Sequence, residues 1–297
     1  MKNVKKGLLV MCSVLLAVSS FAQSNLLNAK TPSQIGLKTA AQLISDNDKP
    51  LAYGYVHDRD ILMGKTVWEV IDLSERINFP LYFPIDENIG SDRRSLYTVL
   101  TTAIKNGKIT EVYSDSYFNT KKTYRDIEAS LSRIDTTDAG REQINAGMKR
   151  VSPEYILRSD LTAQDVTQYK IKGFWYFDKR QSELKYRLLG ICPVTPDVYT
   201  MNSDEKDYIE LFWIFFPSAR NVLHEAKAFN DKNSSMPISF DQILNSRRFN
   251  SVIYKEENVY GDREIKEYMK DNAQKQLIES DRIKEKIRNF ESDMWNY

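Results

Sequence analysis

The stretch YIELFWIFFP, from Tyr208 to Pro217, is the most apolar run after the N-terminal segment, and it decides the fold. A membrane-spanning helix needs about 20 apolar residues, so this run is too short to cross a bilayer. On a strand, one face would carry Ile209, Leu211, Trp213 and Phe215, and the other Tyr208, Phe212, Ile214 and Phe216. Because both faces are apolar, the pattern predicts a central strand covered on both sides and ended by Pro217.

Two further strand-like runs precede this stretch, Lys170 to Phe177 and Leu184 to Cys192, and a short polar turn joins them. They predict a hairpin that forms one antiparallel sheet with the central strand. Residues 218–229 look helical, with Pro217 suited to the first turn. The fold class expected is therefore α+β, with an antiparallel sheet core and peripheral helices.

The segments on either side of these strands add further expected helices and strands to the α+β fold. Trp68 lies in a segment, 61–73, that we expect to be a short helix or turn. Ser91 or Asp92 can cap a helix that ends at Asn106-Gly107, and a strand is expected at 109–113. A polar connector would occupy 123–160. Residues 239–254 repeat the helix-then-strand order, so the core, 51–262, can consist of two related halves, about 51–160 and 161–262. Asp262 can cap a long amphipathic helix over 263–297.

The N-terminus has the pattern of a secretory signal peptide, residues 1–22. Three lysines precede an apolar core, and Ser20-Phe21-Ala22 predicts cleavage between Ala22 and Gln23. Cleavage after residue 22 of 297 leaves 275 residues and removes three of the 42 basic side chains against 41 acidic ones, for a net charge of about −2. Such a balance predicts no strong attraction to nucleic acid. The polar arm, 23–50, is either a disordered leader or a strap that orders on a neighbouring subunit.

Motifs for catalysis or metal binding are missing from the sequence. His57 and His224 are not spaced as metal ligands, and no nucleophile elbow occurs. Cys192 is the only thiol after the signal peptide, so no intramolecular disulfide can form, and we expect it to be buried in the hairpin. No later apolar run could span a membrane. The sequence therefore predicts no catalytic, cofactor-binding or metal-binding residue.

Glu210 is the one charged residue inside the apolar stretch. A buried carboxylate must be paired or protonated. Three alternatives follow for Glu210. It can form a salt bridge to a basic residue such as Arg187 or Arg220, make a subunit contact, or have a catalytic role. The candidate structural or interface residues are Trp68, Phe174, Trp175, Glu210, Phe212, Trp213 and Phe216.

Three segments of the sequence form a distinctive set. The first runs from Trp68 through Ile71-Asp72 and Glu75-Arg76 to Asn78. The second is the run from Leu211 to Pro217. The third holds Ser239-Phe240-Asp241, Arg248-Phe249 and the run from Ser251 to Lys255. Taken together, these segments resemble the gliding motility protein GldN (PorN) family.

This resemblance implies a non-enzymatic component of the type IX secretion system. Such proteins are periplasmic and form a ring with the outer-membrane lipoprotein GldK (PorK), and contact with the periplasmic part of the motor protein GldM (PorM) is expected. No catalytic residues and no cofactor come with the family. The alternative from residues alone is a secreted glycan-binding module or glycoside-acting enzyme that uses surface aromatics and carboxylates. An unrelated homo-oligomeric scaffold is a third. Asp135-Thr136-Thr137 resembles a short O-glycosylation signal, although an ordinary loop explains it as well.

Overall fold

The computed structural model describes residues 31, 49–86, 93–136, 141–142, 145–147, 155–196, 208–230, 238–270 and 272–295. The signal peptide, 1–22, and almost all of the arm, 23–50, lie outside these ranges, as does Thr137. Every element below belongs to one unit formed by residues 50–89 and 93–297.

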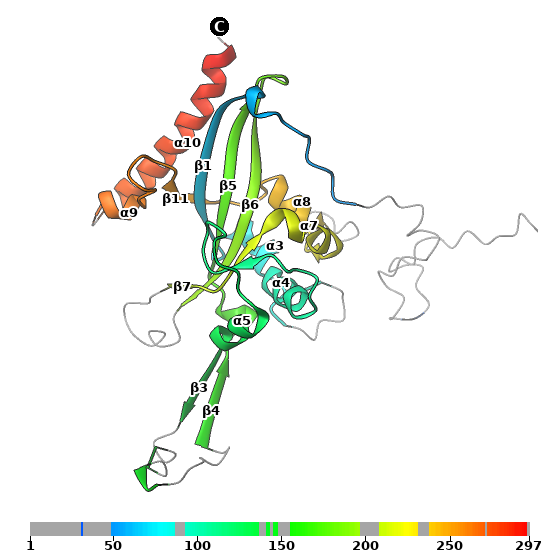
Figure 1. Cartoon of the computed structure of the whole chain (residues 1–297), viewed down its shortest axis with the longest axis vertical. Coiled ribbons are helices and arrows are strands. Elements are labelled where there is room, and N and C mark those ends of the chain that lie inside the picture. The colour runs from blue at the N-terminus through cyan, green and yellow to red at the C-terminus, as the bar shows by residue number, and fades with distance from the viewer. Residues whose placement is uncertain are drawn as a thin grey trace, which may run out of the picture. The chain divides into compact units, whose positions relative to one another are not determined.

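The centre of this unit is a seven-stranded antiparallel sheet, in agreement with the predicted α+β class (Figure 1). Its order is β11-β1-β5-β6-β8-β2, and β7 also pairs with β6. The strands are β1 (Ile61–Asp72), β2 (Val112–Tyr113), β5 (Gln168–Asp178), β6 (Glu183–Pro196), β7 (Tyr208–Glu210), β8 (Trp213–Phe215) and β11 (Val252–Glu256). The predicted hairpin is confirmed as β5 and β6, which pair from Gln168↔Val194 to Asp178↔Glu183.

The apolar stretch is not one strand, and this part of the prediction is wrong. It divides into β7, a break at Leu211 and Phe212, β8, and helix α7 (Phe216–Glu225), whose first turn holds Pro217. The break lets five side chains of the stretch be buried at once, because the strict alternation of a strand is abandoned. Tyr208 and Ile209 lie before it and are 52% and 44% exposed. The prediction that both faces of the stretch are buried is therefore correct for its second half alone.

The segment expected to be a short helix or turn is strand β1. It pairs along its whole length with β5 and, from Val67 to Val70, with β11. Its β-branched residues and its cross-strand partners outweigh the charged residues that suggested a helix surface. A 3-10 helix (η3, Arg76–Asn78) and helix α3 (Phe79–Tyr82) follow.

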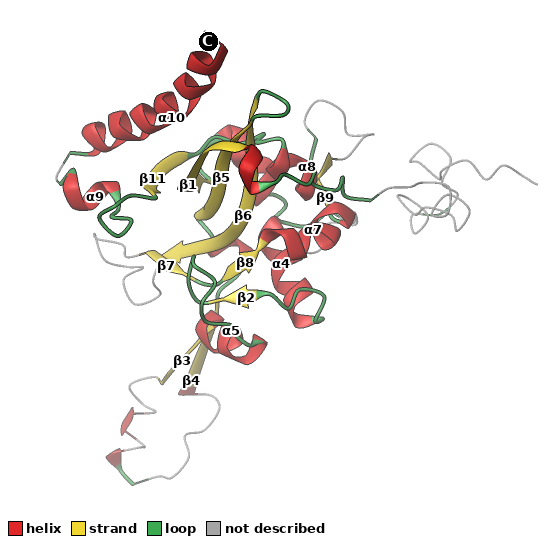
Figure 2. Cartoon of the chain, turned by 45° about the horizontal axis from the view of Figure 1, so that its top comes forward, coloured by secondary structure: helices red, strands yellow, loops and turns green. Residues whose placement is uncertain are grey.

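Among the described residues, five helices contribute to the main core: α3, α4 (Leu96–Lys105), α5 (Tyr124–Leu131), α7 and α8 (Phe240–Asn245) (Figure 1, Figure 2). The N-cap of α4 is Ser95, whose Oγ accepts from the Thr98 N–H at 3.2 Å, and not Ser91 or Asp92 as predicted. Gly107 follows the helix with φ 68°, the conformation expected of its glycine stop. The fully buried side chains of this core include Leu96, Leu100, Phe212, Phe216, Leu223 and Phe240.

Smaller pairs of strands lie outside the central sheet. The region expected to be a polar connector contains a two-stranded sheet of β3 (Ser132–Thr136) and β4 (Ile156–Asp160). A second short pair consists of β9 (Lys227–Ala228) and β10 (Ile238–Ser239). The two helix-then-strand segments place β2 and β11 at opposite ends of the sheet order. A repeat relation between the two halves stays a prediction.

The C-terminal region contains two helices, α9 (Ile265–Tyr268) and α10 (Ala273–Trp295), where the sequence predicted one. Asp262 is not a helix cap: its carboxylate accepts from the Asn258 N–H and the Tyr117 hydroxyl. Helix α10 packs Ile283 and Ile287 against Val67 and Ile253. Among the described residues, no helix has both the length and the apolar composition needed to span a bilayer.

Helix α10 also covers the outer edge of β11. The Ile253 N–H donates to Ser280 Oγ at 2.9 Å, and Lys284 Nζ donates to the Ser251 carbonyl at 2.7 Å. Ser280 is fully buried. An uncovered edge strand is a template for pairing with other chains, so these two side chains occupy backbone groups that a further strand would use.

Replacing Ser280 with alanine is expected to destabilise the protein by about 1–3 kcal/mol, because the buried Ile253 N–H would lose its partner. Amide exchange at Ile253 should accelerate, as hydrogen-exchange mass spectrometry can measure. Ser292 lies exposed on the same helix, so Ser292→Ala is the matched control and should change neither quantity. Unchanged exchange at Ile253 in the Ser280→Ala protein would contradict this role.

Candidate functional site

Glu210 has two partners, and neither is the arginine predicted from the sequence. Its Oε1 accepts from Lys170 Nζ at 2.7 Å and its Oε2 from the Trp213 indole N–H at 2.7 Å. Both partners lie on strands of the central sheet, β5 and β8. The salt-bridge interpretation is therefore correct in kind, with Lys170 in place of Arg187 or Arg220. The carboxylate fixes the junction between β7 and β8.

Cys192 lies beside this junction and is fully buried, as predicted. Burial raises the pKa of its thiol well above the usual value, and the nearby Glu210 charge acts in the same direction. A nucleophilic cysteine needs a stabilised thiolate, so this environment favours packing over chemistry.

The predicted aromatic residues divide into two groups. Trp68, Phe212, Trp213 and Phe216 are at most 1% exposed, so their side chains belong to the interior of the chain. Phe174 and Trp175 are half-buried. The ring of Phe174 lies over Gly64 on the neighbouring strand, and Trp175 contacts Tyr186 at a centroid distance of 4.9 Å. Of the six, only Phe174 and Trp175 keep surface that a partner could reach.

A lysine–aromatic cluster that the sequence did not predict lies on the Trp68 side of the sheet. Lys172 Nζ lies 5.0 Å from the ring centroids of Trp68 and Tyr117 and 5.3 Å from that of Phe118. Lys255 Nζ lies 4.5 Å from the Trp68 centroid. Burial, together with the positive charge of Lys255, lowers the pKa of the Lys172 ammonium group.

This cluster fixes the loop after β2 to the sheet. Lys172 Nζ donates to the Ser116 carbonyl at 3.0 Å, and Lys255 Nζ donates to the Tyr117 hydroxyl at 2.8 Å. The Phe118 ring also lies where a Cβ on Gly190 would be, so glycine allows the close approach. The alternation of Lys170 and Lys172 with apolar residues in β5 was the available signal, but the partners come from distant segments.

Two arginine–carboxylate pairs connect helix α8 and the turn after it to the rest of the fold. Arg247 donates to both oxygens of Glu69 at 3.0 and 2.7 Å, and Glu69 is 1% exposed. Arg220 donates to both oxygens of Asp241 at 2.8 and 3.1 Å. Paired geometry of this kind satisfies buried charges, so these groups stabilise the fold and are not free for acid–base work.

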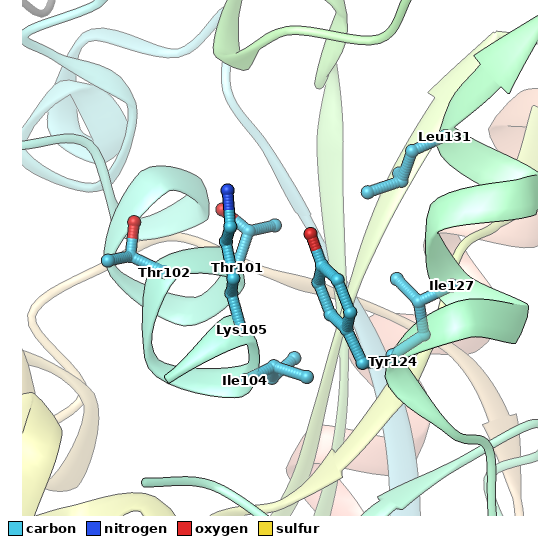
Figure 3. Close-up of a pocket in the computed structure, with 7 residues that line it drawn as sticks. All are labelled: Thr101, Thr102, Ile104, Lys105, Tyr124, Ile127 and Leu131. Carbon is cyan, nitrogen blue, oxygen red and sulfur yellow. The ribbon is translucent and has the colours of Figure 1, made fainter. Parts of the chain in front are cut away.

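One pocket of about 220 Å³ lies between α4 and α5 (Figure 3). Thr101, Thr102, Ile104 and Lys105 line it from α4, and Tyr124, Ile127 and Leu131 line it from α5. Lys105 is its single charged side chain. Within the described ranges, no group of three or more His, Cys, Asp or Glu side chains is placed to hold a metal ion.

The comparisons with known proteins concern the whole fold. A search of curated proteins gives no match. A family model described as "Gliding motility associated protein GldN" matches residues 56–296, from just before β1 to the end of α10. The matched range includes the lysine–aromatic cluster, the two arginine–carboxylate pairs and all seven strands of the sheet. The chain belongs to the GldN family.

Proposed function

We propose that this chain is a non-catalytic building block of a periplasmic ring in the type IX secretion and gliding motility machinery. The family match over residues 56–296 carries this proposal, because it covers the complete sheet and both C-terminal helices. Membership of the GldN family makes the chain a gliding motility and type IX secretion component. Ring formation and the partners are the proposed steps beyond that.

The interior of the described part supports a structural role. The buried carboxylates of the described part all have basic partners within the chain: Glu69 pairs with Arg247, Asp241 with Arg220, Asp178 with Lys185 and Glu279 with Arg282. General acid–base catalysis needs groups that can reach a substrate and have suitable pKa values. Side chains held in this way instead fix strands and helices to one another, which suits a structural component of an assembly.

The partners proposed are a GldK (PorK)-like outer-membrane lipoprotein, further copies of this chain, and the periplasmic part of a GldM (PorM)-like motor protein. The location proposed is the periplasm, reached through a signal peptide that is cleaved between Ala22 and Gln23. Association with the outer membrane would then depend on the lipoprotein.

The direct test is a pull-down of the tagged full-length protein from membranes, followed by mass spectrometry and electron microscopy. The expected result is a ring that contains this chain and a lipoprotein. Recovery of this chain alone, without a lipoprotein, would overturn the ring proposal. A strain without the lipoprotein should also have a low level of this protein, because binding to the folded state stabilises it.

Removal of the arm, residues 23–50, from the exported protein is expected to weaken co-purification with the lipoprotein. The unit that contains all the described helices and strands begins at Pro50, so the thermal unfolding temperature of the deletion protein should match that of the wild type. Quantitative pull-down and a thermal melt measure the two effects. Undiminished co-purification would show that the arm is not a strap for this partner.

A further inference from the structure

A slot lies between the segment before β1 and the β5–β6 hairpin, beside the outer edge of β6. Residues 51–56 line one side of it, and Tyr176 and Asp178 of β5 with Lys185, Tyr186 and Arg187 of β6 line the other, around a volume of about 300 Å³. Figure 1 shows this segment leaving the end of β1 nearest the β5–β6 turn. We refer to this space as the β6 slot.

The edge of β6 at the slot has no further strand partner among the described residues from Lys185 to Leu188, whereas the Leu184 N–H donates to Glu291 Oε1 at 3.4 Å. From Glu183 to Leu188, β6 pairs with β5 on its inner side. Its outer side pairs with β8 only at Gly190 and Ile191, and with β7 only from Val194 onward. An edge strand of this kind offers backbone groups to an extended segment, which can add to the sheet as a further strand.

The slot is held open by a tyrosine between two arginines. The Tyr53 ring lies 4.6 Å from the Arg187 guanidinium carbon and 4.1 Å from that of Arg220. Its hydroxyl donates to Asn245 Oδ1 at 2.7 Å, and Arg187 donates to the Gly54 carbonyl at 3.1 Å. These contacts hold residues 51–56 beside β6. The slot between the two is therefore maintained by side-chain contacts within the chain.

The charge at the slot favours an acidic occupant. Arg220 is neutralised by Asp241, and Lys185 lies 3.6 Å from Asp178. Arg187 has no carboxylate within ion-pair distance in the part of the chain that the structure describes. Leu51 and Tyr55, on the opposite side of the slot, are 85% and 78% exposed. A segment that combines apolar residues with carboxylates therefore fits both sides.

We propose that residues 43–48 of a second copy of this chain add as a strand to the β6 slot. Their sequence is Leu43-Ile44-Ser45-Asp46-Asn47-Asp48, an apolar pair followed by two aspartates. On a strand Asp46 and Asp48 share one face, where one of them can reach Arg187. Six extended residues cover about 20 Å, which is enough to span the part of β6 from Lys185 to Leu188.

This inference rests on the self-association within the proposed function. The donated segment comes just before the slot in sequence, so each copy offers both an arm and a slot. Such contacts are head-to-tail, and they close into a ring when the rotation between neighbours permits it. Copies of the chain would therefore join through the β6 slot of one copy and residues 43–48 of the next.

The test uses the mature chain, residues 23–297, in two charge-reversed forms. One form carries Arg187→Glu in the slot, and the other carries Asp46→Lys with Asp48→Lys in the arm. Sedimentation velocity over a concentration series measures self-association. Each form alone is expected to associate more than about tenfold more weakly than the wild type, because like charges would meet. An equimolar mixture of the two forms should associate again, since each arm then meets a slot of opposite charge.

The control is Lys179→Glu, which makes the same charge change on the β5–β6 turn at an exposed position. It should associate as the wild type does. A thermal melt of each form separates weaker association from loss of the fold, and the recovery in the mixture cannot come from unfolded protein.

The inference would be overturned by a wild-type chain that is monomeric at all concentrations, by wild-type association in either reversed form, or by a mixture that stays monomeric. A change in thermal stability without any change in mass would mean that each arm occupies its own slot, which also overturns it. Recovery of the lipoprotein in the membrane pull-down, together with any of these results, would leave the proposed function intact and remove this inference alone.

Discussion

Replacing Trp213 with alanine is expected to lower the free energy of unfolding by about 3–5 kcal/mol. Trp213 is fully buried among Trp68, Cys192 and Val194, and its indole N–H donates to Glu210. The substitution would leave a cavity between the strands and remove one partner of a half-buried carboxylate. Urea unfolding followed by circular dichroism measures the change.

The matched control is Tyr260→Ala, which removes a large ring that is 70% exposed. Its effect should be within about 0.5 kcal/mol of zero. A Trp213→Ala protein of wild-type stability that fails to co-purify with the proposed lipoprotein partner would place the side chain in assembly contacts and contradict its position in the core.

Replacing Arg247 with alanine is expected to cost about 3–5 kcal/mol, because the Glu69 carboxylate would stay buried without its charge partner. Glu69 lies in the middle of β1 and also accepts a hydrogen bond from the Ser251 hydroxyl. Arg247 packs on Tyr186 as well, with its guanidinium carbon 4.2 Å from the ring centroid. Chemical denaturation at neutral pH is the measurement.

Removing both charges distinguishes the contribution of the Glu69–Arg247 ion pair to stability from that of side-chain packing. The double substitution Glu69→Gln and Arg247→Met should be less destabilising than Arg247→Ala alone, because no charge is left buried. The surface pair of Lys108 and Glu225, with side chains 58% and 70% exposed, is the control. Lys108→Ala should cost no more than about 1 kcal/mol. A double variant as unstable as the single one would show that packing dominates.

Local patterns predicted those parts of the fold that depend on neighbours in sequence. The β5–β6 hairpin, the glycine stop of α4 and the position of Pro217 in α7 each follow from a few adjacent residues. Strand β1 was misread because Trp68, Glu69 and Asp72 suggest a helix surface when its partner strands are unknown. Its two partners are β5 and β11, about 100 and 190 residues further along the chain.

The site residues likewise could be predicted only as far as their neighbours in sequence determine them. The sequence indicated that Glu210 needs a cation, but Lys170 becomes its neighbour only through the pairing of β6 with both β5 and β7. The lysine–aromatic cluster brings together Trp68, Tyr117, Lys172 and Lys255, which no spacing rule connects. The break at Leu211 and Phe212 could not be read from an apolar run, because its cause is the packing of both residues into the main core.

The pairing of β1 with β11 also constrains the order in which this protein can reach its native state. β1 is the first of the described strands to leave the ribosome, yet the residue that neutralises Glu69 is Arg247, 178 positions later. Until synthesis passes that point, one side of β1 has no native partner and Glu69 has no counter-charge. Long-range pairing of this kind slows folding and exposes strand edges to aggregation. A nascent chain of this protein is therefore exposed to aggregation through β1 until nearly all of its sequence has been made.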